Sequence, residues 1–131
     1  MPNSIGRLSS LEYLGLTDNQ LTELPVTIGN LSNLKELFLP KNRLSNLPNE
    51  IGRLKKLKKL ACRENTLTSI PESIGDLLLL EQLSLGANNL TAIPERIGGL
   101  IELQTLGIEK NKISELPQSI CNLKKLEILS S

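Results

Sequence analysis

The side chains that could do chemistry here are aromatic, acidic, basic and amide groups, because histidine is absent and cysteine occurs only twice. Without histidine, metal sites of the His/Cys kind and every general base or triad built on imidazole are excluded. Cys62 and Cys121 lack partners at metal-binding spacing and lie more than two sequence repeats apart, so we expect free thiols and no disulfide. The sequence therefore predicts recognition rather than catalysis, with no enzyme activity, no cofactor and no metal.

These groups are placed by a period of 23 residues that runs through the whole sequence. Three residue types keep this step: Ile5, Ile28, Ile51, Ile74, Ile97 and Ile120; Asn19, Asn42, Asn65, Asn88 and Asn111; Pro25, Pro48, Pro71, Pro94 and Pro117. Leucine keeps it from Leu11 to Leu126. One such unit cannot bury its own apolar side, so a fixed internal period predicts stacked units, that is, a solenoid.

Each unit contains a signal for one short strand and one return segment. In the first full unit Leu14 and Leu16 alternate with Tyr13 and Gly15, which is the period of a half-buried strand. The asparagine that follows is flanked by leucines, and a buried amide is tolerated only when it is hydrogen-bonded. After the Leu-Pro or Ile-Pro pair, apolar residues at helical spacing predict a short helix or 3-10 turn.

We therefore predict an α/β solenoid, a right-handed curved horseshoe segment with one parallel sheet. The strands pair in register about 4.8 Å apart. The helical or 3-10 segments are wider than strands, so the sheet side becomes concave and the other side convex. The predicted domain organisation is a single domain over 1–131, made of a partial repeat 1–10, five full repeats 11–125 and a terminal strand 126–131.

The outward strand positions vary between units and are the predicted binding surface. The only two aromatic residues of the chain, Tyr13 and Phe38, fall there on adjacent strands, so their side chains can touch. Exposed aromatics within a polar rim are common anchors of protein interfaces. The charged rim alternates in sign, which can orient a partner or serve only solubility. The predicted partner-binding residues are Glu12, Tyr13, Lys35, Glu36, Phe38, Lys58, Lys59, Arg63, Glu81 and Gln82.

Charge and hydropathy narrow the classes of partner. With 15 basic and 14 acidic side chains the chain lacks the basic surface that nucleic acids require, so no nucleic-acid partner is predicted. The longest uninterrupted apolar stretch is Leu77–Leu80, far below the roughly 18 residues that cross a bilayer, so no membrane insertion is predicted. The first residues carry no secretory signal, which predicts a cytoplasmic protein as written, or a secreted or cell-surface one if a leader precedes it.

Two features depart from the repeat pattern. Leu78, Leu79 and Ile101 stand where other units carry serine or lysine, and we expect partial burial between neighbouring units, with a second contact surface as the alternative. No polar capping unit is visible at either end of the stack. We therefore expect self-association through the uncapped ends, or a longer array of which these repeats are a part.

The unit that starts at Leu34, LKELFLPKNRLSNLPNEIGRLKK, resembles the leucine-rich repeat signature LxxLxLxxNxL followed by LPxxIGxLxx, and the resemblance covers the entire chain. This form is similar to leucine-rich repeat proteins of pathogenic bacteria, notably spirochaetes, and to the intracellular Ras-group repeats of eukaryotes and plants. The resemblance implies protein recognition through the concave face. Bacterial relatives of the internalin kind bind host surface receptors such as cadherins.

Three functions follow as hypotheses from the resemblance. The first is a virulence-associated module that engages a host cell-surface receptor. The second is an intracellular scaffold of the Ras-group kind in a signalling pathway. The third is the substrate-recognition repeat region of a larger enzyme, such as a ubiquitin ligase. By register, the resemblance assigns partner contact first to Tyr13, Glu36, Phe38, Lys59 and Gln82.

Overall fold

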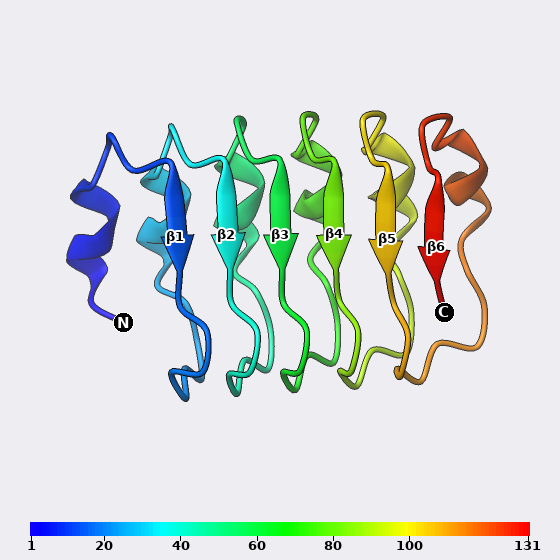
Figure 1. Cartoon of the computed structure of the whole chain (residues 1–131), viewed down its shortest axis with the longest axis horizontal. Coiled ribbons are helices and arrows are strands. Elements are labelled where there is room, and N and C mark those ends of the chain that lie inside the picture. Colours follow the sequence, from blue (N-terminus) through cyan, green and yellow to red (C-terminus); the bar gives the residue numbers. More distant parts are fainter.

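The computed structural model describes all residues, 1–131, and shows six stacked turns (Figure 1). Each turn contributes one three-residue strand to a single sheet. The strands are β1 (Tyr13–Gly15), β2 (Glu36–Phe38), β3 (Lys59–Ala61), β4 (Gln82–Ser84), β5 (Thr105–Gly107) and β6 (Ile128–Ser130). No helix of the structure has the length and apolar character needed to cross a membrane.

The strands pair only in parallel and in sequence order, β1 to β6. Tyr13 lies opposite Glu36, and Glu36 opposite Lys59, so paired residues are 23 positions apart in the sequence. This confirms the predicted register. Residues that share a position in successive turns therefore form columns across the sheet, and we call the outward side of the sheet the strand face.

The return segment of each turn is a five-residue 3-10 helix, and these helices cover the side of the sheet opposite the strand face (Figure 1). They are η1 (Asn3–Arg7), η2 (Val26–Asn30), η3 (Asn49–Arg53), η4 (Glu72–Asp76), η5 (Glu95–Gly99) and η6 (Gln118–Asn122). A proline with extended backbone precedes each helix, for example Pro48 with φ −68° and ψ 151°. Because proline fixes φ near this value and lacks an N–H, it suits a helix start.

The core lies between the sheet and the 3-10 helices and is entirely aliphatic apart from Cys62. The central strand leucines, Leu37 and Leu83, have no exposed surface, whereas Leu14 in β1 is half-buried and Leu129 in β6 is 44% exposed. The difference follows from position, because each leucine is covered by the turns on both sides of it. Burial on this pattern, together with the single parallel sheet, confirms the predicted α/β solenoid.

The buried asparagines are hydrogen-bonded, as the sequence predicted, and they also link successive turns, which it did not predict. Asn65 Nδ2 donates to the carbonyls of Leu39 and Cys62 at 2.9 and 3.0 Å, while its Oδ1 accepts from the Leu44 N–H at 3.0 Å. The same pattern recurs at Asn42 and Asn88. Each amide therefore satisfies backbone groups of its own turn and of the preceding one, which is why a polar side chain is tolerated at this depth.

Glycines in the 3-10 helices set how closely the turns stack. A Cβ on Gly52 would stand 2.7 Å from the Ser73 carbonyl oxygen of the next turn, closer than any side chain permits. Cys121 occupies the equivalent position in η6, where no further turn packs against it, and it is exposed. This position of the repeat therefore requires glycine where the next turn packs against it and tolerates a larger residue where none does.

The expected partial burial of Leu78, Leu79 and Ile101 is wrong. Their exposed fractions are 53%, 44% and 56%. Leu78 and Leu79 are the middle residues of a tight turn whose end residues, Leu77 and Leu80, are buried and joined by a 3.0 Å hydrogen bond. Because both ends of this turn enter the core, its middle has to face solvent.

Candidate functional site

The strand face carries an aromatic pair at the β1–β2 end. The rings of Tyr13 and Phe38 are tilted by 35°, with centroids 5.5 Å apart, which is a favourable geometry for aromatic contact. Tyr13 is 56% exposed although it makes this contact. Gly15 makes room for the ring, because its absent Cβ would stand 2.8 Å from the Tyr13 hydroxyl oxygen. The predicted contact between the two aromatics is confirmed, and it leaves more than half of the Tyr13 surface open to solvent.

A hollow of about 280 Å³ lies beside the aromatic pair on the strand face. Six of the predicted binding residues line it: Glu12, Tyr13, Lys35, Glu36, Lys58 and Lys59. Tyr13 is its only apolar wall, and the others are charged. Sites for drug-sized ligands measure about 300–1,000 Å³ and are mostly apolar. The hollow therefore suits a single side chain of a partner better than a free small molecule.

The charges around the hollow are paired between adjacent strands. Lys35 Nζ lies 3.1 Å from Glu12 Oε1, and Lys59 Nζ lies 3.2 Å from Glu36 Oε1. Lys58 pairs at 3.8 Å with Glu81, which places Glu81 next to the hollow although it does not line it. With Glu81 included, three lysines face three glutamates, so the hollow and its immediate rim carry no net charge. The sequence predicted these residues and their alternating signs. It did not predict which lysine pairs with which glutamate, because that depends on side-chain conformations.

Arg63 lies apart from the hollow, beyond the end of β3, and pairs with a residue that the sequence reasoning did not assign to the site. Arg63 Nε is 3.5 Å from Glu109 Oε1, two turns away. The two residues share a column with Gly86 between them, and the Glu109 carboxylate occupies the space that a Gly86 side chain would fill. The sequence did contain a sign of this ion pair, because the two opposite charges are two repeats apart, at a distance of 46 positions, and the equivalent position of the repeat between them is a glycine.

The column of Phe38 forms a small-residue floor next to the aromatic pair. Beyond Phe38 its column contains only small residues, namely Ala61, Ser84, Gly107 and Ser130. Gln82 is exposed on β4, paired in register with Lys59, and borders this floor. A partner that rests on Tyr13 and Phe38 can therefore extend along this column from β3 to β5 without meeting a bulky side chain in it, with Lys59 and Gln82 at its side.

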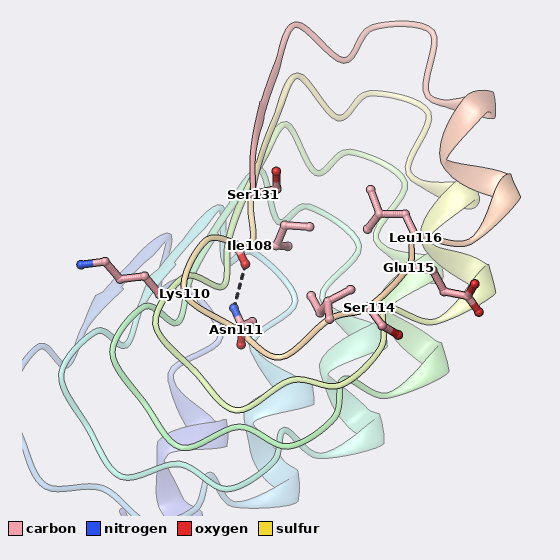
Figure 2. Close-up of a pocket in the computed structure, with 8 residues that line it drawn as sticks. Ile108, Lys110, Asn111, Ser114, Glu115, Leu116 and Ser131 are labelled. Carbon is pink, nitrogen blue, oxygen red and sulfur yellow. Dashed lines mark hydrogen bonds between the residues drawn. The ribbon is translucent and has the colours of Figure 1, made fainter.

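A larger cavity of about 400 Å³ lies at the open side of the last turn (Figure 2). Ile113 and Leu116 line it and are half-buried, whereas their equivalents one turn earlier, Leu90 and Ile93, are buried. Asn111 Nδ2 donates to the Ile108 carbonyl at its edge at 3.0 Å. The cavity is thus an uncovered part of the solenoid interior, and we assign it no function.

The two thiols have opposite environments. Burial raises the pKa of Cys62 from its ordinary 9.0 to about 12, because the thiolate would lie in an apolar interior. Cys121 is exposed, and both cysteines are free. Neither contributes to a cluster of three or more potential metal ligands.

Comparison with known proteins gives consistent results. A family model described as a leucine-rich repeat region matches residues 2–88 and 72–131. The solved structure of a leucine-rich repeat protein of Leptospira interrogans is 42% identical over 98% of this chain and 33% of that one, with a TM-score of 0.90. The plant peptide hormone receptor RGFR1, solved in complex with RGF2, is 37% identical over 99% and 22% of the two chains, with a TM-score of 0.90.

The leucine-rich repeat domain of the type III effector XopL is 32% identical over 98% of this chain and 47% of that one, with a TM-score of 0.91. A search of curated proteins found no match. The chain therefore spans about a third of the length of the Leptospira protein and about half of the XopL domain.

Proposed function

Because the chain belongs to the leucine-rich repeat family, we propose that it binds a partner protein through the strand face. The observation that carries this proposal is the aromatic pair on the strand face, formed by the exposed Tyr13 and the half-buried Phe38. The scaffold does not need either ring, since the core is aliphatic and complete without them. Aromatic side chains held rigidly at a surface lose little conformational entropy on binding, which makes them effective anchors.

The surroundings of the aromatic pair support the same proposal. The hollow accepts one side chain of the partner, and the small-residue floor lets the partner backbone approach the sheet. The Lys–Glu pairs around the hollow are partly exposed, so they contribute at most about 1 kcal/mol each and mainly orient the partner. The expected interface is therefore an apolar anchor surrounded by a rim without net charge.

The proposal is tested by capture of a partner with the wild-type chain and with a Tyr13→Ala, Phe38→Ala double variant. Loss of two aromatic anchors that the partner would cover is expected to weaken binding at least about a hundredfold. Val26→Ala is the matched control, because Val26 is as exposed as Tyr13, at 56%, but lies on the opposite side of the solenoid. Equal recovery of the same partner by the wild type and the double variant would show that the site assignment is wrong.

In its finer form, the proposal is a virulence-associated role in which the partner is a host cell-surface receptor, such as a cadherin. The support is the spirochaete-like repeat type and the similarity to a Leptospira interrogans protein. Surface plasmon resonance with a purified cadherin ectodomain tests this form directly. Binding lost in the aromatic double variant would support it, and absence of binding would reject the cadherin.

The alternative is an intracellular Ras-group-like scaffold, and the two free thiols favour it because such cysteines are ordinary in reducing compartments. A third form is the substrate-recognition region of a larger enzyme, and the similarity to the leucine-rich repeat domain of a type III effector supports only that such repeats form one domain of a longer protein. In that form the repeats themselves carry no catalysis. Determination of the segments encoded next to these repeats separates the three, since a leader, further repeats and an appended domain each favour a different one.

Self-association is a separate part of the proposal. β1 and β6 each pair on one side only, and Ile128 on β6 is 53% exposed. Unpaired strand edges recruit other chains. Sedimentation over a range of concentrations tests this, and a single monomeric species throughout would reject it.

A further inference from the structure

A second apolar surface lies on the tight turns that lead from the 3-10 helices into the strands. We call Leu78, Leu79 and Ile101 the turn patch. Leu78 and Ile101 share a column in adjacent turns, so the patch is continuous across two turns of the stack. The equivalent positions elsewhere carry polar side chains: Ser9, Ser10, Ser32, Asn33, Lys55, Lys56, Glu102, Lys124 and Lys125. Nothing in the packing of η4 or η5 requires apolar residues there, since all three face solvent.

Lysines border the turn patch on both sides along the stack. Lys55 and Lys56 occupy the turn before it, and Lys124 the turn after it. Lys55 Nζ donates to the Gly52 carbonyl at 2.8 Å, and Lys56 Nζ donates to Asn33 Oδ1 at 2.7 Å. Both acceptors are uncharged. The two ammonium groups are therefore held in place while their positive charges remain available to a partner.

The acidic groups next to the turn patch are already neutralised. Asp76 pairs with Arg96, and Glu102 Oε2 lies 2.6 Å from Lys125 Nζ. The patch is consequently an aliphatic surface between positively charged borders. From this arrangement we infer that the turn patch docks an acidic amphipathic segment of a partner protein. Its aliphatic side chains would cover the patch and its carboxylates would meet the flanking lysines.

A second copy of this chain fits the turn patch poorly. A two-fold contact through the patch would bring the basic borders of one copy against those of the other, because both borders carry lysine. An anionic lipid surface also fits less well. The apolar contact spans only two turns, about 5 Å apart, which is narrow for insertion into a lipid surface. The observations therefore favour an acidic protein segment over a second copy or a membrane.

The test uses a fluorescein-labelled peptide about five helical turns long, with leucine on one face and glutamate elsewhere. Fluorescence anisotropy is expected to show binding that weakens with salt. A Leu78→Ser, Ile101→Ser double variant should bind at least about tenfold more weakly, because two aliphatic contacts are lost. A Lys56→Gln, Lys124→Gln double variant should reduce the salt dependence of peptide binding, because two of the flanking positive charges are removed. Val26→Ser is the matched control, since it removes an equally exposed aliphatic side chain elsewhere.

This inference does not rest on the proposed function of the strand face. The Tyr13→Ala, Phe38→Ala variant should bind the acidic peptide as the wild type does, so the two proposals can fail separately. Equal binding of the peptide by the wild type and the Leu78→Ser, Ile101→Ser variant would overturn the inference, as would no binding at low salt. Two other results would also overturn it. One is binding to phosphatidylserine vesicles that requires the turn patch while peptide binding does not, and the other is a dimer in sedimentation that requires the patch while peptide binding does not.

Discussion

Replacement of Asn65 by alanine tests the hydrogen-bond column that joins the turns. The Leu44 N–H has Asn65 Oδ1 as its only acceptor, so the variant leaves a buried donor unpaired. The carbonyls of Leu39 and Cys62 each lose one bond but keep another, from Asn42 and Asn88 respectively. The substitution therefore removes these three bonds and a longer one of 3.4 Å to the Arg63 carbonyl, and it leaves only the Leu44 N–H without any partner.

The expected cost follows from these three losses. An unpaired buried N–H costs about 1–3 kcal/mol, and each lost carbonyl bond costs about 0.5–1.5 kcal/mol. The free energy of unfolding should thus fall by about 4 kcal/mol, out of about 5–15 kcal/mol for a typical domain. Urea unfolding followed by far-ultraviolet circular dichroism is the suitable assay, because tryptophan is absent and the only tyrosine lies in the edge strand β1.

Asn19 is the matched control within the same column. It is exposed, and its side chain makes only one hydrogen bond, at 2.9 Å to the Thr17 carbonyl. Asn19→Ala should therefore change the free energy of unfolding by no more than about 0.5 kcal/mol. If Asn65→Ala and Asn19→Ala are equally mild, the amide column does not hold the turns together and the reasoning fails.

Three further outcomes are expected. Gly52→Ala should lower the free energy of unfolding by about 1–3 kcal/mol, since its Cβ meets the next turn, whereas Cys121→Ala should be neutral in the same urea assay. A thiol reagent at neutral pH should modify only Cys121 in the native chain and both cysteines in urea; rapid native modification of Cys62 would contradict its burial. Because the pKa of Cys62 is raised from 9.0 to about 12, the unfolded thiol ionises first. Stability should therefore fall by about 1.4 kcal/mol per pH unit between these values, and Cys62→Ala should abolish that component.

Most of the fold could be predicted from the sequence because each residue type in the repeat has one physical role. Alternating leucines specified the strands, and the strict period specified a parallel sheet with paired residues 23 apart. The buried asparagine had to find backbone partners, and it does. The contact between Tyr13 and Phe38 followed from register alone, because adjacent strands place outward residues side by side.

Two other features could not be predicted, because they depend on local geometry that the position of a residue in the repeat does not specify. The exposure of Leu78 and Leu79 is set by a tight turn whose two ends are buried, and periodicity gave no sign of this. The bridge from Arg63 to Glu109 requires two long side chains to reach across the space left by Gly86. Local turn geometry decided the first and side-chain conformation the second, whereas backbone register decided the features that were predicted.

The most direct measurement of the central claim is hydroxyl-radical footprinting of the chain alone and with its captured partner. Aromatic side chains report well in this experiment, and both lie on the strand face. Oxidation of Tyr13 and Phe38 should fall strongly in the complex, while oxidation of Val26 on the opposite side stays unchanged. Undiminished oxidation of Tyr13 and Phe38 in a complex that protects the 3-10 helices would contradict the account.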